Sequence, residues 1–350
     1  MKTSSPIRLV VLALAAAALA CSTVTGSGTG TTGATPTVAR PTRAATEEVA
    51  ATEVVEEEAT ATDEAAPEPT DEPTPEPVTA YLGDVVEDGG LALTALEIED
   101  PATPGTLYQP APNTRLVAVE VVLGNIDLER FAAGPSALTL IDSEGRTYPF
   151  AVAAQDDVAM AAITLMPGER LRGWAAFEVQ DDAVLAAVRF SAPDEGVTMQ
   201  VSLTPRPDGV AALTGTPRTA PDLPPLGTAA EGGGYTLTAL QVEDPTTPGF
   251  LYTPVEGRKL VAVEILVGNE SGAAVTVNSL FTYLVDTEGY VYPGRLFGRD
   301  GQIETLSIGP GDKLQGWVSF ELPDGATPEG VRYLFDLFSG FSLVAGVAAP

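Results

Sequence analysis

Apolar residues recur at every second position in several segments of the chain, which is the pattern of half-buried β-strands. In the segment 116–123 both phases are largely apolar, as expected for a strand in the middle of a sheet. One face takes Val117, Val119, Val121 and Leu123, and the other takes Leu116, Ala118, Glu120 and Val122. The pattern therefore predicts a central strand.

A second segment changes its phase part of the way along. Residues 91–95 alternate in one phase, after which Leu96 and Ile98 take the opposite phase. One extra residue in a strand shifts the alternation in this way, so a β-bulge is predicted. The same slip recurs at Ala239 and Leu240.

The recurrence belongs to a duplication with an offset of 144 residues. Residues 115–125 align with 259–269, and seven of the 11 pairs are identical. Other matched groups are Asp100-Pro101, Gly105 and Leu107-Tyr108 with Asp244-Pro245, Gly249 and Leu251-Tyr252, and Gly173-Trp174 and Phe177-Glu178 with Gly316-Trp317 and Phe320-Glu321. Each copy is large enough to form its own hydrophobic core. We expect domains at 80–204 and 226–350, joined by a Pro-rich, semi-rigid linker at 205–225.

Turn signals separate the strands of each copy. Asp142-Ser-Glu-Gly145 and Asp286-Thr-Glu-Gly289 place glycine where a hairpin turn needs a positive φ. Pro167-Gly168-Glu169 and Pro310-Gly311-Asp312 mark another turn. Strands at this spacing, with little helix, predict an all-β chain built from two antiparallel sandwiches.

The first 20 residues have the pattern of an export signal. Lys2 and Arg8 precede an apolar run of 12 residues, Leu9 to Ala20, which is too short to span a bilayer. The run ends in Ala18-Leu19-Ala20-Cys21, which resembles the lipobox of bacterial lipoproteins. We therefore predict that Cys21 is lipidated and attaches the chain to the outer face of the cell membrane. The alternative is conventional cleavage of the signal beside an uninvolved cysteine.

Residues 21–79 are predicted to be a disordered acidic tether. From Ser22 to Thr79 the chain has no aromatic residue and carries 12 acidic against two basic residues. Such a segment cannot bury a core, and its Pro-rich end favours an extended spacer.

Composition removes several classes of function. The 350 residues carry a net charge of −30, which disfavours nucleic-acid binding. Histidine is absent, which excludes Ser-His-Asp catalysis and His-ligated zinc. The single cysteine excludes an internal disulfide and multi-cysteine metal sites.

The ordered motifs, repeated twice, resemble a bacterial domain of unknown function that is common in lipoproteins. That domain is related to the telokin-like, mycobacterial immunoprotective extracellular proteins. The resemblance covers about Ala80 to Thr204 and Leu226 to Val344 and rests on Asp-Pro, Leu-Tyr, Arg/Lys-Leu-Val-Ala-Val-Glu, Pro-Gly-Glu/Asp and Gly-Trp-x-x-Phe-Glu in that order. It implies two tandem immunoglobulin-like sandwiches outside the cell, and it brings no catalytic residues.

Four aromatic residues are candidates for ligand contact. Trp174 and Trp317 fall on the strand phase opposite to the core. Each is either covered by the loop that carries Tyr108 or Tyr252, or free to stack on a sugar or a partner protein. Structural cover is the favoured interpretation.

The carboxylates support weaker hypotheses. The Asp-x-Glu-Gly turns suggest calcium, although a plain hairpin turn is favoured because the alternating ligand series of a calcium loop is missing. Glu120 and Glu264 interrupt apolar strands and suggest a hydrolase pair, although a solvated face or an arginine partner is favoured.

The predicted function is non-enzymatic: a lipid-anchored cell-envelope protein that presents two immunoglobulin-like modules to a protein or glycan partner. The alternative is an extracellular carbohydrate- or calcium-binding module of a secreted complex. No catalytic residue, metal ligand or cofactor is predicted, and no nucleic-acid partner.

Overall fold

The computed structural model describes residues 79–106, 108–152, 159–336 and 339–348. The signal segment, Cys21 and the tether up to residue 78 lie outside these ranges, so what the sequence indicates about them stays a prediction. Within the described ranges, no helix has the length and apolarity needed to cross a bilayer. The described residues of both copies belong to one compact unit.

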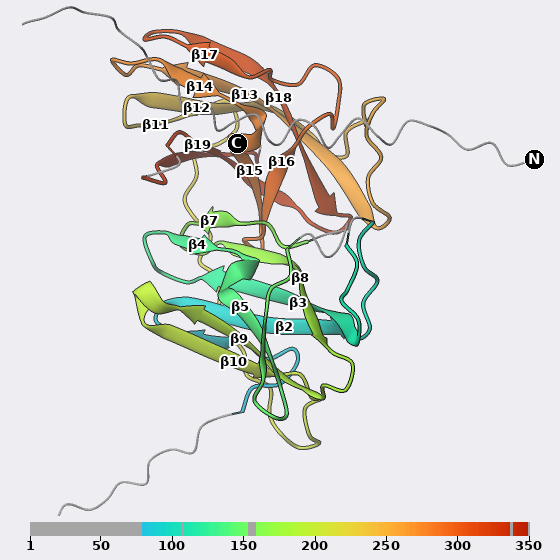
Figure 1. Ribbon diagram of the computed structural model, residues 1–350. Helices are drawn as coiled ribbons and strands as arrows, with labels where there is room; N and C mark the ends of the chain where they lie inside the picture. The colour runs from blue at the N-terminus through green and yellow to red at the C-terminus, as the bar shows by residue number, and fades with distance from the viewer. Residues whose placement is uncertain (1–78, 107, 153–158, 337–338, 349–350) are drawn as a thin grey trace, which may run out of the picture. The chain divides into compact units, whose positions relative to one another are not determined.

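The first repeat is a sandwich of two antiparallel four-stranded sheets with a short two-stranded ribbon (Figure 1). The first sheet has the order β1-β2-β3-β8, with β1 Val86–Asp88, β2 Leu91–Glu99, β3 Thr114–Asn125 and β8 Arg170–Gln180. The second has the order β10-β9-β5-β6, with β10 Val197–Ser202, β9 Leu185–Ala192, β5 Leu138–Asp142 and β6 Thr147–Pro149. The ribbon pairs β4 Phe131–Ala133 with β7 Ile163–Leu165. The predicted central strand is confirmed, because β3 lies between β2 and β8.

The second repeat has the same strand order with one addition. Its strands are β11 Ala229–Gly232, β12 Tyr235–Glu243, β13 Arg258–Asn269, β14 Val275–Val277, β15 Thr282–Asp286, β16 Val291–Arg295, β17 Leu306–Ile308, β18 Lys313–Pro323, β19 Pro328–Leu334 and β20 Ser342–Gly346. Here β16 also pairs with β18, which joins eight strands into one continuous sheet. In the first repeat the corresponding contact is the isolated bridge between Phe150 and Phe177. The two tandem sandwiches predicted from the sequence are therefore present.

The predicted β-bulges are confirmed at the same place in both copies. The pairing of β2 with β3 shifts between Ala95 and Glu97, and the pairing of β12 with β13 shifts between Ala239 and Gln241. The residues that the ladder skips are Leu96 and Leu240, where the apolar alternation changes phase. Each bulge reverses the alternation of its strand. The apolar positions therefore point to the core on one half of the strand and to the outer face on the other half.

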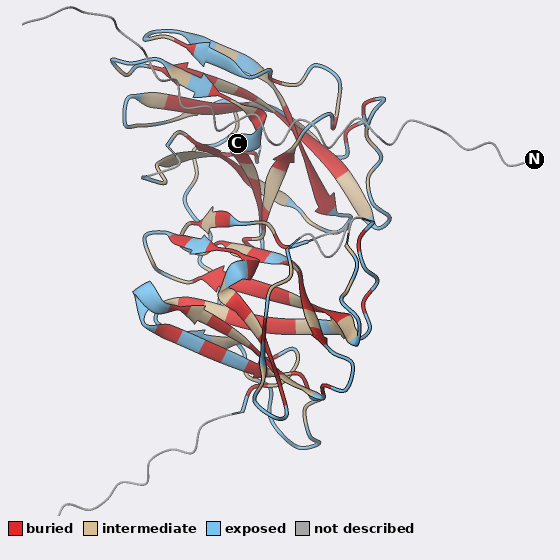
Figure 2. Cartoon of the chain, viewed as in Figure 1, coloured by how far each residue is buried: buried red, intermediate tan, exposed pale blue. Residues whose placement is uncertain are grey.

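The inward phase of each sandwich forms its core (Figure 2). Phe177 and Phe190 are fully buried in the first repeat, and Phe320 and Tyr333 in the second. Helix in the described residues is limited to short 3-10 turns, such as Pro135–Ala137, Pro193–Glu195 and Ser279–Phe281.

The Pro-rich segment 205–225 runs along the first repeat and is tied to it. Asp84 is buried and accepts hydrogen bonds from Arg206 and, at 2.8 Å, from the Leu213 N–H. Thr216 donates from its N–H and its hydroxyl to Glu87, at 2.6 and 2.7 Å. Side-chain carboxylates of the first repeat therefore fix the course of a segment that has no regular structure of its own.

Candidate functional site

The tyrosine loop is attached to a strand glutamate in both repeats. The Tyr108 hydroxyl donates to Glu178, whose other oxygen accepts from Thr114 Oγ1 at 2.6 Å and the Ala111 N–H at 2.8 Å. These three donors lower the pKa of Glu178. Burial, together with the hydrogen bond to Glu178, raises the pKa of Tyr108 to about 12. Tyr108 and Glu178, which belong to two separate motifs of the sequence, thus meet in space.

The second repeat repeats this arrangement with arginines added. Tyr252 donates to Glu321, and the Val255 N–H donates to the same carboxylate at 2.8 Å. Glu321 is buried and also lies 3.5 Å from Arg295 and 3.8 Å from Arg258. Burial raises the pKa of Tyr252, and the bond to Glu321 acts in the same direction.

The two tryptophans have internal contacts. Trp174 packs in a small cluster with Tyr108 and the buried residues Ala102, Leu116, Ala118 and Ala176. Trp317 lies under the guanidinium of Arg299, whose Cζ is 3.9 Å from the ring centroid, a cation–π contact. Both side chains are half-buried. The structure therefore packs Tyr108 and Trp174 against the same buried cluster, whereas Trp317 is covered by an arginine from a different loop. Ligand contact by the four aromatic residues stays a prediction.

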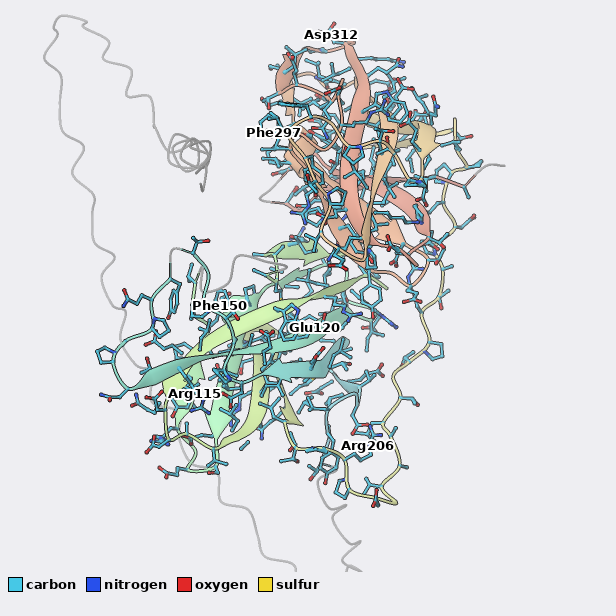
Figure 3. All side chains as sticks on the ribbon, turned by 90° about the vertical axis from the view of Figure 1, so that its right-hand side faces the viewer. Arg115, Glu120, Phe150, Arg206, Phe297 and Asp312 are labelled. Atoms are coloured by element: carbon cyan, nitrogen blue, oxygen red, sulfur yellow. The ribbon has the colours of Figure 1, made fainter. Side chains whose placement is uncertain are left out.

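Other motif residues form pairs across neighbouring elements. Arg115 contacts the two oxygens of Asp100 at 2.6 and 2.9 Å, and Lys259 lies 2.8 Å from Asp244. Glu120, labelled in Figure 3, forms a bidentate pair with Arg172 at distances of 2.8 and 2.9 Å. Glu264 accepts from Gln315 at 2.9 Å. The favoured interpretation of Glu120, an arginine partner, is confirmed.

The predicted hairpin turns are also confirmed, because Gly145 and Gly289 have φ of 81° and 87°. Asp142 accepts two turn N–H groups on one oxygen and Tyr148 at 2.8 Å and Arg146 at 2.5 Å on the other. Asp286 makes the corresponding N–H and Tyr292 contacts. In both turns the donors of the chain occupy the oxygens that a calcium ion would need. Within the described residues, no group of three acidic or cysteine side chains is placed to hold a metal.

One difference between the two turns changes their electrostatics. Burial acts to raise the pKa of Asp142, but the hydrogen bonds from Arg146, Tyr148 and the turn lower it to about 2. In the second repeat Tyr290 occupies the place of Arg146. Burial then dominates and raises the pKa of Asp286, although Tyr292 and the turn N–H groups act in the opposite direction.

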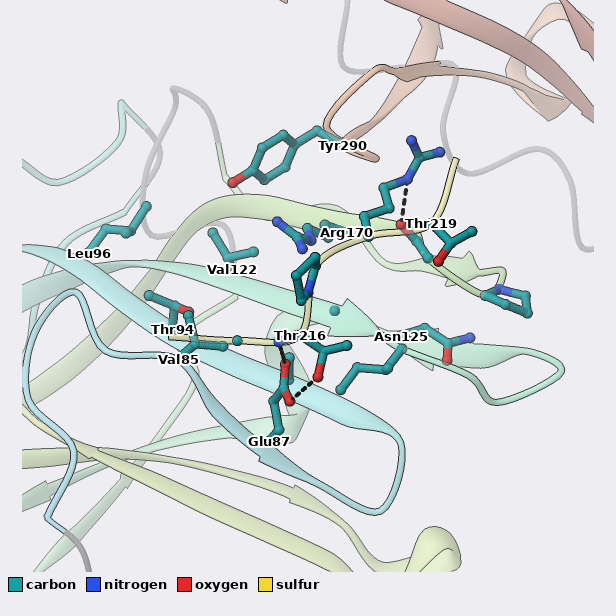
Figure 4. A pocket seen from close by; sticks show the side chains of 18 of the residues that line it. Val85, Glu87, Thr94, Leu96, Val122, Asn125, Arg170, Thr216, Thr219 and Tyr290 are labelled. Atoms are coloured by element: carbon teal, nitrogen blue, oxygen red, sulfur yellow. Dashed lines mark hydrogen bonds between the residues drawn. The ribbon is translucent and has the colours of Figure 1, made fainter. Parts of the chain in front are cut away.

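A groove of about 550 Å³ lies on the outer face of the first sheet (Figure 4). Its floor includes Thr94 and Leu96 of β2 and Val122 of β3, and residues 215–219 of the Pro-rich segment form one wall. Tyr290 borders it on another side. Glu87 and Arg218 line the groove but are engaged, with Thr216 and with the Gly168 carbonyl.

Arg170 is the distinctive group of the groove. It is half-buried, and within the described part of the chain its guanidinium has neither a hydrogen bond nor an ion pair. Its N–H donates to the Gly289 carbonyl at 2.8 Å, which fixes its backbone. An arginine held beside apolar floor residues, with its donors unused, is suited to a carboxylate.

Buried contacts between the two repeats keep this groove in place. Glu169 and Arg332 form an ion pair at 3.3 Å, and both are almost fully buried. Arg332 Nη2 donates to the Thr164 carbonyl at 2.8 Å, and its guanidinium stacks 4.7 Å from the Tyr283 ring centroid. Burial raises the pKa of Glu169 against the opposing effect of Arg332.

The Pro-rich segment adds a second contact at the same place. Arg218 donates to the Gly168 carbonyl at 3.1 Å, to the Thr287 carbonyl at 3.1 Å and to both oxygens of Glu329. Val285 and Val291 of the second repeat pack with the core cluster of the first. The linker arginine therefore bridges the copies that it connects.

Sequence reasoning missed Arg170, Arg218, Arg332 and Tyr290. A signal was available for Tyr290, which lies where the copies differ. Arg332 and Arg170 have the basic counterparts Arg189 and Lys313, and Arg218 lies in the Pro-rich segment outside the duplicated region. Tyr290 replaces Arg146, and Tyr283 replaces Thr139. Differences between two copies of one fold indicate where a copy has gained a contact of its own.

The fold defines a protein of two tandem immunoglobulin-like β-sandwiches, and the family can be stated on that basis. Residues 80–196 and 225–341 each match the Domain of unknown function (DUF4352), so the chain belongs to this family. No curated protein matches the chain.

Among solved structures, the chain is similar to MPT63, a secreted protein from Mycobacterium tuberculosis. The identity is 16%, the TM-score 0.29, and the match covers 38% of this chain and 100% of MPT63. The yjhA protein from Bacillus subtilis matches with 13% identity and a TM-score of 0.29, over 36% of this chain and 99% of that one. An uncharacterized β-sandwich protein from Clostridium difficile matches with 13% identity and a TM-score of 0.22, over 37% and 99%.

Proposed function

We propose that this chain is a non-enzymatic, lipid-anchored protein of the cell envelope that holds two immunoglobulin-like modules in contact with a partner protein. The observation that carries the proposal is the unpaired Arg170 guanidinium in the groove between the first sheet and the Pro-rich segment. The partner would offer a carboxylate, from an acidic side chain or a chain terminus, next to an apolar group.

The chemistry of the groove selects this ligand class. The chain as a whole has a net charge of −30 and repels anions. At short range, however, the unpaired positive charge of Arg170 attracts one anionic group. A carboxylate accepts two parallel hydrogen bonds from a guanidinium, and Leu96 and Val122 offer apolar contact beside it. A glycan partner is less well supported, because Tyr108 and Trp174 both pack against a small buried cluster of the chain and Trp317 lies under Arg299.

The non-enzymatic part of the proposal rests on the state of the carboxylates. Glu120, Glu178, Glu321, Asp142 and Asp286 all accept hydrogen bonds from the chain itself. General acid–base catalysis needs a carboxyl group that can reach a substrate proton. These five carboxylates support the fold instead.

The attachment to the membrane is tested by Cys21→Ala. Metabolic labelling with an alkyne fatty acid should mark the wild-type chain and not the variant. A variant that still takes up the label would refute lipidation at Cys21, whichever fraction it is found in, and it would leave the groove hypothesis untouched.

The groove is tested with the chain from Ser22 to Pro350 as bait for envelope proteins and, separately, for cell-wall glycan fragments. A protein captured by the wild type should be lost with Arg170→Gln and kept with Arg189→Gln, which removes a charge from the other sheet of the same repeat. Capture that does not depend on Arg170 would contradict the groove hypothesis. If only glycan is captured, and its capture depends on Arg170, the partner would be an acidic sugar and not a protein.

A further inference from the structure

One end of the second repeat exposes four large apolar side chains from two loops. Phe250 and Leu251 lie in the loop between β12 and β13 and are 97% and 71% exposed. Leu296 and Phe297 follow β16 and are 49% and 63% exposed. The Gly249 N–H donates to the Gly298 carbonyl at 2.8 Å, so the two loops lie side by side. We call these four residues the apolar tip.

The loops that carry the tip are held in place by the fold. Tyr252 is bonded to Glu321 next to Phe250 and Leu251. Arg299 lies on Trp317 and pairs with Glu243 at 2.9 Å, which fixes the second loop to the first. Phe297 (Figure 3) has a φ of 61°, a conformation that is unfavourable for a residue with a bulky side chain. Strain of this kind persists where the surroundings impose it, and it is concentrated at functional positions.

The tip is not a requirement of the fold. At an offset of 144 residues, the first repeat has Thr106 in place of Phe250 and Ala153 in place of Phe297. Both repeats have the same strand order without sharing these phenylalanines. Large apolar side chains that the fold does not need, and that water surrounds, indicate an interaction site.

The charge around the tip differs from that of the whole chain. The loop segments 243–259 and 295–300 contain Glu243, Asp244, Glu256 and Asp300 against Arg258, Lys259, Arg295 and Arg299. Four acidic and four basic residues give a local net charge of zero, whereas the whole chain has −30. The tip can therefore approach a surface that would repel other parts of the chain.

We propose that the apolar tip is a membrane-docking element, which inserts Phe250, Leu251, Leu296 and Phe297 into the headgroup region of a lipid bilayer. A projecting group with 97% exposure suits a soft, deformable surface, because a protein partner would need a matching cavity. A locally neutral tip inserts best into a neutral surface. This inference goes beyond the proposed function and does not require the anchor at Cys21.

The test uses the chain from Ser22 to Pro350, which lacks the only cysteine, and sedimentation with phosphatidylcholine vesicles. Binding is expected for the wild type and should resist added salt, since it depends on apolar insertion. Phosphatidylglycerol in the vesicles should weaken it, because the chain is strongly acidic. Vesicle binding by the double variant Phe250→Ser/Phe297→Ser should be at least about tenfold weaker than that of the wild type. Val152→Ser, which removes a 76% exposed side chain at the matching place of Leu296 in the first repeat, should bind like the wild type.

A second measurement places the tip in the bilayer directly. Phe250→Cys labelled with a polarity-sensitive fluorophore should show a blue shift on adding vesicles, whereas the same label at Val152→Cys should show none. Vesicle binding that survives the double serine variant, or no binding at all, would refute the proposal. Concentration-dependent dimers that the serine variant abolishes, without vesicle binding, would assign the tip to a second copy of the chain instead.

Discussion

Glu169 of the first repeat and Arg332 of the second form a buried ion pair at 3.3 Å, although their counterparts Asp312 and Arg189 have no such partner in the described structure. Asp312 is exposed, at the same turn in which Glu169 is buried. The turn is therefore common to both copies, and the ion pair is an addition made where the copies meet.

Breaking this pair from one side should be costly. Arg332→Met leaves Glu169 buried without its cation, which typically costs about 3–5 kcal/mol in the free energy of unfolding. Glu169→Gln/Arg332→Met should lose less, since no unpaired charge remains. Urea unfolding measures both, and Arg189→Met, the matching change in the first repeat, is the control. Equal losses for Arg332→Met and Arg189→Met would contradict the buried pair.

The same pair predicts how the junction responds to pH. The pKa of Glu169 is raised in the folded state, so the unfolded chain releases that proton first as pH rises. The contribution of Glu169 to stability is therefore largest below the pKa of the unfolded chain and decreases as pH rises through the folded pKa. Glu169→Gln should remove this part of the pH dependence in urea unfolding. An unchanged profile would contradict the raised pKa of Glu169 in the folded chain.

The tyrosine–glutamate bonds predict a stability loss at high pH. The pKa of Tyr108 is about 12 in the folded chain, against about 10 in an unfolded one. The stabilisation is complete below pH 10 and is lost as pH rises towards 12. Tyr108→Phe should lose about 1–3 kcal/mol at neutral pH and should be less sensitive to alkali.

Tyr235→Phe is the control for that experiment. Tyr235 stacks on Phe335, and its hydroxyl has no hydrogen-bond partner within the described residues. Denaturant unfolding at neutral and alkaline pH compares the two variants. If Tyr108→Phe behaved like Tyr235→Phe, the bond to Glu178 would contribute nothing.

Exchanging one turn residue should convert the electrostatics of one repeat into those of the other. In Arg146→Tyr, the first repeat acquires the residue type of Tyr290, and the pKa of Asp142 should rise from about 2. A carboxylate whose pKa is lowered in the folded state stabilises the fold above the pKa of the unfolded chain, and this stabilisation is lost as pH falls towards 2. Because the variant has less of this stabilisation, it should lose less stability in acid. Carboxyl carbon shifts in NMR follow the titration. A pKa that stays near 2 would assign the effect to Tyr148 and the turn.

Trp174→Ala should destabilise the first repeat and Trp317→Ala the second. Removing a tryptophan from a packed site costs about 3–5 kcal/mol, and half-buried side chains belong at the lower end of that range. Thermal unfolding measures the loss, and binding to cell-wall fragments or protein partners is measured alongside. Unchanged melting with lost binding would make the tryptophans recognition residues.

The Pro-rich segment should be cut without separating the repeats. Residues 207–212 are exposed, which makes them the expected point of proteolysis. The two fragments should elute together, because the Glu169–Arg332 pair and the contacts of Arg218 hold them. Arg332→Met should make them separate more readily. Separation of wild-type fragments would mean that the repeats are independent units.

The strand content of the fold could be predicted because it follows from local periodicity. Alternation over 116–123 and the phase slip at Leu96 are properties of consecutive residues, so the central strand and the bulge could be located. The pairing of Tyr108 with Glu178 was not predicted, since the residues are 70 positions apart and only the folded chain brings them together.

The groove was beyond sequence reasoning for a different reason. Arg170 follows a predicted turn, and nothing local distinguishes it from other arginines. Its character comes from the residues that surround it, Tyr290 from the second repeat and the segment 215–219. The sequence also gave no sign that Arg218 would bridge the two repeats from within a Pro-rich segment.

The contact between the copies is head-to-tail, because the turn of one repeat meets the sheet of the next. Contacts of this kind generate open filaments when every unit has both surfaces. Here the first repeat has Thr139 where the second has Tyr283, and the second has the shorter Asp312 where the first has Glu169. A further copy of the chain would therefore lack the ring contact that Tyr283 makes and would meet a shorter acidic side chain, so we expect that the chain does not form filaments through this contact.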